Sequence, residues 1–136
     1  MPIQFPVPPG TILRCNFHTF KEPEMTKSRP VIVLSPLIQA HSRSTLLVAP
    51  LSTKEPNPCL NYHLKVTLPG TAIPKDLLRQ CWLKGDMVYS LCLSRLDFYH
   101  FDRDKITGKR VYYKDKFTGE DLFNIRKAIM HAIGLH

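Results

Sequence analysis

An arginine and a pair of hydroxyl residues stand at the ends of two strongly apolar segments of this sequence. Arg29 follows a polar loop that carries Glu24, and it comes just before a β-branched run that begins at Val31. The second apolar segment ends in Ser52 and Thr53. A guanidinium offers forked donors that match phosphate, and it stays charged at any working pH. Two neighbouring buried strands that end in this way predict a phosphate site. The alternative is a surface arginine at the start of a core strand.

Lys84 and Asp86 flank a glycine in the apolar segment Cys81–Tyr89. Side chains alternate along a strand, so we expect the amine and the carboxylate to share one face. Such a pair could serve as acid and base in phosphodiester cleavage. An ordinary ion pair on a strand is the alternative that the spacing leaves open. A glycine inside a strand often marks a bulge or a close backbone approach, and we expect one at Gly85.

The four cysteines are scattered, and none belongs to a Cys-x-x-Cys pair. Cys59 and His63 have ligand-like spacing, with Cys81 as a third candidate for a zinc site. The sequence offers no convincing fourth ligand. We therefore expect no metal and no cofactor.

Composition indicates a basic, globular protein. The 136 residues are 43% hydrophobic and 22% charged, which is enough for one core but not for two independent ones. The net charge is +8, with Lys and Arg concentrated between Arg103 and Lys116, and this favours a polyanionic partner such as nucleic acid. No apolar run is long enough to cross a bilayer, and the N-terminus lacks a signal-peptide pattern. We expect a cytoplasmic protein with no membrane partner.

Short apolar runs bounded by turn residues predict a mainly β protein, a barrel or sandwich, with a C-terminal helix. We expect one domain over residues 1–136, opened by a proline-rich lead over 1–9. The expected strands cover residues 11–17, 30–35, 45–51, 62–67, 81–89 and 109–113, with a short helical turn at 94–97.

The segment 118–134 is the clearest helix. Thr118 is the expected N-cap, and two acidic residues in the first turn favour the helix dipole. An apolar face of Leu122, Ile125, Ile129 and Ile133 is expected to pack on the barrel.

Four motifs follow one another along most of the chain. They are Pro9-Gly10-Thr11-Ile12-Leu13, Glu24 to Ser35, Val48 to Thr53, and Trp82 to Tyr89. In this order they resemble the PemK/MazF family of bacterial toxins, small endoribonucleases of type II toxin–antitoxin pairs. Glu22 to Met25 and the ending His131 to Leu135 are similar to the YifN-like branch of that family.

The resemblance implies an SH3-like or CcdB-like barrel that forms a homodimer, cleaves single-stranded RNA without a metal, and is inhibited by a cognate acidic antitoxin. In the implied reaction a 2′-hydroxyl attacks its own phosphate and leaves 2′,3′-cyclic phosphate and 5′-hydroxyl ends. The implied catalytic residues are Arg29, Ser52, Asp86, Lys84 and Glu24. The implied RNA-binding residues are Lys27, Thr53, Lys54 and His63.

By the family resemblance at these positions, Arg29 would stabilise charge on the phosphate, and the Ser52 hydroxyl would donate to a phosphate oxygen. Asp86 matches a proposed general base and Lys84 a proposed general acid, while Glu24 would set the arginine or contact RNA.

The chain differs from the family pattern at two of these positions and at one neighbouring position. Ser52 replaces the usual threonine, Lys84 replaces an arginine, and Pro23 stands where some members carry a histidine. A lysine carries charge but lacks the fork geometry of arginine. Two alternatives therefore stay open: a non-catalytic CcdB-like toxin that binds a protein such as DNA gyrase, and an inactive nucleic-acid-binding module.

Overall fold

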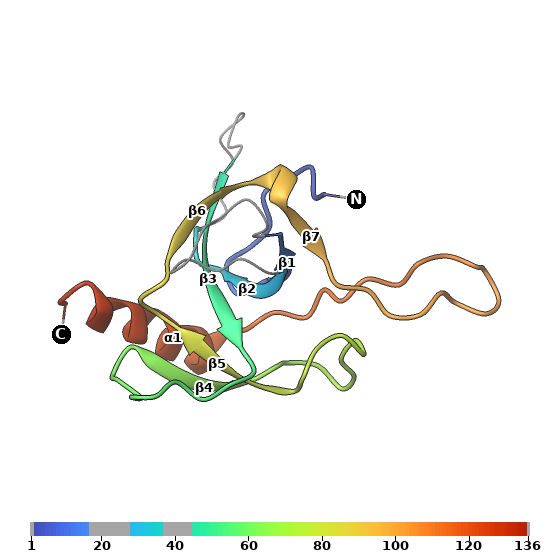
Figure 1. Cartoon of the computed structure of the whole chain (residues 1–136). Coiled ribbons are helices and arrows are strands. Elements are labelled where there is room, and N and C mark those ends of the chain that lie inside the picture. Colours follow the sequence, from blue (N-terminus) through green and yellow to red (C-terminus); the bar gives the residue numbers. More distant parts are fainter. Residues whose placement is uncertain (1, 17–27, 37–44, 136) are drawn as a thin grey trace.

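A curled antiparallel sheet with a helix at its C-terminal end makes up this protein (Figure 1). The computed structural model describes residues 2–16, 28–36 and 45–135, and these contain seven strands and one α-helix. The elements are β1 (Ile12–Cys15), β2 (Arg29–Val33), β3 (Thr45–Ser52), β4 (His63–Thr67), β5 (Gln80–Lys84), β6 (Tyr89–Cys92), the 3-10 helix η1 (Leu93–Arg95), β7 (Leu96–Phe98) and α1 (Gly119–Ala132). The expected β fold with a C-terminal helix is confirmed.

Strand β3 is the centre of the sheet. The strand order is β4-β5-β3-β2-β1-β7, and β6 also pairs with β3. The C-terminal end of β3 pairs with β5, whereas its N-terminal half pairs with β6. In Figure 1 the strands β1, β2, β6 and β7 curl around one side of β3, and β4 and β5 lie beside α1.

The two faces of the curled sheet bury separate apolar clusters. Alternation divides β2 between them, because Ile32 joins one cluster while Val31 and Val33 join the other. The first cluster includes residues from β4, β5 and α1, and the second is built from β1, β2, β3, β6 and β7. Continuous β-branched runs in the central strands follow from this burial on both faces.

Helix α1 packs on the sheet through a narrow face. Thr118 is the N-cap, as expected, although its side chain makes no capping hydrogen bond. Ile125 is fully buried, and Leu122 and Ile129 are partly buried against the first cluster. The expectation for Ile133 is wrong, because it lies beyond the end of the helix and is 67% exposed. No helix in the described ranges has both the length and the apolar character to cross a membrane.

The predicted strand 81–89 is two strands joined by a turn. Continuing the β5 register along β3 would set Asp86 opposite Val48, but Tyr89 occupies that place three residues later. The extra residues form a turn in which the Met87 N–H donates to the Lys84 carbonyl at 3.1 Å. The prediction that Lys84 and Asp86 share a strand face is therefore wrong, since the strand ends at Lys84.

The predicted edge strand 109–113 is also wrong. This segment returns along residues 99–104 as a hairpin that leaves the sheet (Figure 1, orange). The backbone pairs Phe101 with Val111 at 2.8 Å and Asp104 with Lys109 at 2.9 Å. Along this hairpin the pairing amounts to one isolated antiparallel bridge, His100 with Tyr112, and not to a continuous strand.

Candidate RNA-binding and active site

Arg29 and Ser52 stand at the same end of the β2–β3 ladder. β2 begins at Arg29, and β3 ends at Ser52. The register sets Val31 opposite Pro50, and continuing it by two residues sets Arg29 opposite Ser52. Directly opposed residues of antiparallel strands share a face, with Cβ atoms about 4.5–5.5 Å apart. The two strands thus deliver a guanidinium and a hydroxyl to one place at the end of the ladder.

The environment of Ser52 suits a hydrogen-bond donor to a ligand. Ser52 is 8% exposed, and its hydroxyl oxygen accepts from the Lys54 backbone N–H at 3.2 Å. Accepting this bond orients the oxygen and leaves the hydroxyl proton to donate. Thr53 and Lys54, which follow directly, are exposed. The end of β3 therefore offers one oriented hydroxyl and a loop that is open to solvent.

Strands β4 and β5 extend the same face of the sheet. Trp82 lies opposite Ser52 on one side and Lys65 on the other, and Lys84 lies opposite His63. These two rows lie about 7 Å apart along the strands, since they are two residues apart. The residues between them point to the core beneath α1. The face with Arg29 and Ser52 is therefore the face of β4 and β5 that turns away from the helix.

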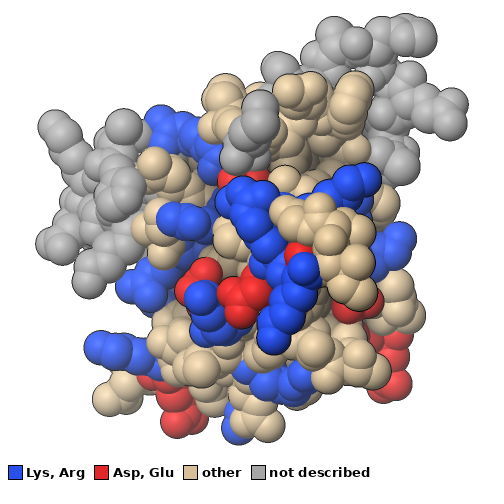
Figure 2. Space-filling view, turned by 90° about the vertical axis from the view of Figure 1, so that its right-hand side faces the viewer, with Lys and Arg blue, Asp and Glu red and all other residues tan. Residues whose placement is uncertain are grey.

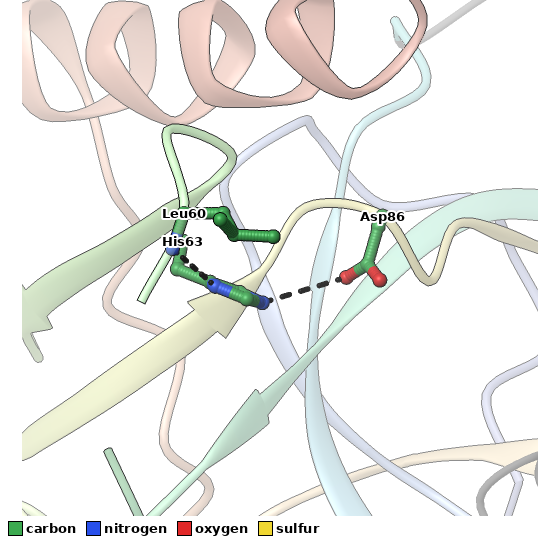
Figure 3. Close-up of polar contacts among 3 residues, drawn as sticks. All are labelled: Leu60, His63 and Asp86. Carbon is green, nitrogen blue, oxygen red and sulfur yellow. Dashed lines mark hydrogen bonds and ion pairs between the residues drawn. The ribbon is translucent and has the colours of Figure 1, made fainter. Parts of the chain in front are cut away.

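His63 connects this face to the turn that carries Asp86 (Figure 3). Its Nδ1 accepts from the Leu60 backbone N–H at 3.0 Å, and its Nε2 lies 3.8 Å from the Asp86 Oδ1. Because Nδ1 is an acceptor, the neutral ring carries its proton on Nε2, on the side of the carboxylate. The His63 side chain is 10% exposed and the Asp86 side chain 43%. A buried, oriented imidazole thus faces a carboxylate that solvent and ligands can reach.

Gly85 fixes the place of this turn. Its N–H donates to the Tyr62 carbonyl at 3.0 Å. A Cβ at this position would come within 2.5 Å of the same carbonyl oxygen and 3.5 Å of the Ala128 backbone. Only glycine allows the turn to sit so close to the Tyr62 carbonyl, just before β4. The expected close backbone approach at Gly85 is confirmed, and it sets the position of the neighbouring carboxylate.

Some predicted site residues fall elsewhere. Glu24 and Lys27 lie outside the described residues, as does Pro23. The three candidate zinc ligands do not come together, and the described ranges contain no group of three or more His, Cys, Asp or Glu side chains arranged to hold a metal. Cys81 is buried and its thiol donates to the Leu78 carbonyl at 3.1 Å, whereas Cys59 is exposed.

Trp82 is the site-face residue that sequence reasoning did not single out. It is the single tryptophan of the chain. It lies between two buried residues of β5, Cys81 and Leu83, so it projects from the opposite face. The signal that could have found it is the alternation itself, since a large aromatic residue occupies a polar-face position.

A basic hairpin, residues 99–116, projects from the sheet (Figure 1). Its tip is held by Asp104, whose carboxylate accepts from the backbone N–H groups of Ile106 at 2.7 Å and Thr107 at 3.0 Å. These bonds lower the pKa of Asp104 below its ordinary value. Figure 2, viewed from the hairpin side, shows Lys and Arg side chains spread over this face with fewer acidic ones among them. The local concentration of positive charge read from the sequence is therefore a surface feature.

A sequence model of the PemK-like, MazF-like toxins of type II toxin–antitoxin systems matches residues 9–109. The chain belongs to this family. The resemblance read from the four motifs is confirmed, and assignment to the YifN-like branch stays a prediction. Comparison with curated proteins gives no match.

Solved structures of MazF toxins and of a mycobacterial endoribonuclease share the fold. An endoribonuclease in complex with its cognate antitoxin, from a mycobacterial species, is 15% identical with a TM-score of 0.61, over 96% of this chain and 98% of that chain. MazF of Deinococcus radiodurans is 17% identical with a TM-score of 0.60, over 97% and 100%. The Mycobacterium tuberculosis toxin MazF-mt6 is 18% identical with a TM-score of 0.57, over 93% and 98%. At these identities the likeness establishes the barrel fold.

Proposed function

We propose that this PemK/MazF-family protein is an endoribonuclease toxin that cleaves single-stranded RNA and is held in check by a cognate antitoxin. One observation carries the proposal: β2 begins at Arg29 and β3 ends at Ser52 at the same end of their ladder, where the register continued by two residues sets them opposite each other, on the face that also bears His63. Two of the solved structures with this fold are named as endoribonucleases, and one of them is bound to its antitoxin, which supports the same assignment.

The reaction we propose is an internal transfer. The RNA 2′-oxygen forms a bond to phosphorus while the bond from phosphorus to the 5′-oxygen breaks. Asp86 accepts the 2′-hydroxyl proton, and the Lys84 ammonium donates a proton to the departing 5′-oxygen. Arg29 and the Ser52 hydroxyl stabilise the negative charge that builds on the equatorial oxygens. The products carry 2′,3′-cyclic phosphate and 5′-hydroxyl ends.

His63 has a positioning role in this proposal. The Leu60 N–H holds Nδ1, so the Nε2–H points toward Asp86 and keeps its carboxylate beside the sheet face. Glu24 and Lys27 belong to the loop that precedes Arg29, and we assign them to orienting Arg29 and to contacting RNA. Thr53 and Lys54 extend the RNA contact beyond Ser52.

A chelator experiment tests metal-independent cleavage. Base, acid and charge stabiliser are all side chains here, so cleavage of a long unstructured RNA should persist in excess EDTA. The 5′ ends should accept phosphate from a polynucleotide kinase, and a 2′-deoxy substitution at the cut site should block the reaction. Arg29→Ala should lower the rate roughly a hundredfold, while Arg110→Ala, on the exposed hairpin, should lower it little. Loss of cleavage in EDTA with rescue by a divalent ion would contradict the mechanism.

The inhibitor we propose is an acidic, initially disordered segment of the antitoxin. The protein carries a net charge of +8, and carboxylates of such a segment would pair with Lys27, Arg29 and Lys84 as it folds onto the site. Its association rate should fall markedly as salt rises, because attraction between opposite charges is screened over about 8 Å at physiological ionic strength. An antitoxin that binds while RNA stays fully bound would exclude direct competition.

We further propose that the toxin acts as a homodimer in the cytoplasm. A twofold arrangement would place the same surface on both subunits and build an RNA groove from two copies of the site. Sedimentation equilibrium at micromolar concentration should give a mass near twice 15.7 kDa. A monomer under these conditions would contradict the homodimer.

A further inference from the structure

Trp82 occupies an unusual position for a large aromatic side chain. It is half-buried, and it projects from the face of β5 that turns away from the core and α1. Its neighbours across the ladder are the exposed Lys65 on β4 and the hydroxyl of Ser52 on β3. An indole has one of the largest apolar surfaces of any side chain, so leaving part of it open on a polar face invites a flat ligand.

The surroundings of Trp82 suit a nucleobase that is attached to a phosphate. Lys65 lies directly across from Trp82 on β4, and Lys84 lies two residues along β5 on the same face, so both supply positive charge next to the indole. Ser52 lies directly opposite, and Arg29 comes next in the same cross-strand row. Surfaces that bind single-stranded nucleic acid combine these two elements, cationic groups along the backbone and aromatic rings on which bases stack.

We propose that Trp82 is a base-stacking subsite, which holds the nucleobase next to the phosphate that Arg29 and Ser52 bind. The inference rests on the proposed ribonuclease function and adds a residue to it. Stacking tolerates any base, so Trp82 contributes affinity and fixes the strand on the sheet. The choice among bases then falls to groups that reach the base edges.

The fluorescence of Trp82 provides a direct test, because the chain contains one tryptophan. The probe is a short single-stranded oligonucleotide of fully 2′-O-methylated RNA, which lacks the free 2′-hydroxyl needed for cleavage. Titration should quench the tryptophan emission to saturation, with the same dissociation constant that the anisotropy of a fluorescein-labelled probe reports.

Three variants give the matched comparison. Trp82→Ala should weaken probe binding by about 5- to 150-fold, the range expected for loss of one stacked base. Trp82→Phe keeps a smaller ring and should recover most of the affinity. Phe123→Ala removes a ring that is 62% exposed on α1, and it should leave binding unchanged. Thermal unfolding of each variant checks that the fold is intact, and if Trp82→Ala does not fold, the quenching of the unmodified protein decides.

Cleavage of a long RNA by the unmodified protein is measured in parallel. If the protein cleaves RNA and binds the probe, but emission is not quenched or Trp82→Ala binds equally well, the stacking subsite is refuted while the ribonuclease function stands. If the protein neither cleaves RNA nor binds the probe, both proposals fail.

Discussion

Replacing Gly85 by alanine tests whether the close approach at this turn positions the site. The added Cβ would stand 2.5 Å from the Tyr62 carbonyl oxygen, at least 0.5 Å inside the 3.0 Å limit that real Cβ contacts keep. The obstacle is the backbone carbonyl of Tyr62, the residue just before β4, so no flexible side chain can move aside. The Ala128 backbone, at 3.5 Å, is in ordinary van der Waals contact. The turn itself must therefore shift away from β4.

Two free-energy costs make up the expected loss of stability: the steric overlap of the added Cβ and a weakened hydrogen bond. Overpacking of this kind typically costs about 1–3 kcal/mol. The shift also weakens the 3.0 Å hydrogen bond from the Gly85 N–H to the Tyr62 carbonyl, at about 1 kcal/mol. Together these give about 2–4 kcal/mol. For a chain of 136 residues this lowers Tm by roughly 10 °C.

Cleavage should fall more than the folded fraction does. Asp86 is the next residue, and a displacement of 1 Å in a reacting group can cost about a hundredfold in rate, so a shift near 0.5 Å should cost about tenfold. The assay is single-turnover RNA cleavage at a temperature well below the Tm of both proteins, alongside thermal unfolding followed by circular dichroism.

The matched control is Gly119→Ala. Gly119 has a φ of 55° but nothing within 4 Å of the added Cβ. We expect a cost of about 1–2 kcal/mol for a left-handed alanine and no change in cleavage. If Gly85→Ala unfolds at the original temperature, or if both variants cleave RNA equally well, the role assigned to this close approach is refuted.

Three further changes test other parts of the structure. His63→Ala removes the acceptor for the Leu60 N–H, and it should cost about 1–3 kcal/mol in chemical denaturation and lower the rate of cleavage. Leu83→Ala empties a fully buried position and should cost about 2–5 kcal/mol, whereas truncation of exposed Leu78 should cost little. Burial raises the pKa of Cys15 to about 11 and the pKa of Tyr113 to about 12, above the ordinary values of these groups. As pH rises, the unfolded chain loses these protons at a lower pH than the folded protein does, so the free energy of unfolding should be constant below about pH 9 and fall from there to about pH 12. Tyr113→Phe should reduce that fall. A free energy of unfolding that does not change with pH over this range would contradict the prediction.

The strands that could be predicted from the sequence are those whose burial produces a continuous run of apolar residues. The apolar runs of β2 and β3 are buried over most of their length on both faces, and each is bounded by polar residues or proline. The apolar pattern wrongly predicted one strand from Cys81 to Tyr89, because nothing in the pattern marks the turn of three extra residues between β5 and β6. It also failed in the hairpin, where backbone bonds at Asp104 decide the conformation.

The candidate site divides in the same way. Arg29 and Ser52 end neighbouring apolar strands, so the sequence could predict that they lie close together. The contact of His63 with Asp86 depends on the pairing of β4 with β5 and on the close approach at Gly85, which join residues far apart in the chain. No local pattern encodes that contact. Trp82 was overlooked for a different reason, since its face becomes evident only once the core side of β5 is known.

The place of β3 in the sheet also determines how readily the site can unfold locally. It is hydrogen-bonded to β2, β5 and β6, and its last residue is Ser52. Amide hydrogens at the centre of such a strand exchange with solvent through opening of the whole sheet rather than through fraying at an edge. We therefore expect the amides of Ala49 and Leu51 to be among the slowest to exchange in the protein. If exchange confirms this, the end of β3 keeps its shape for as long as the protein stays folded, and an inhibitor must act by covering the site and not by unfolding it locally.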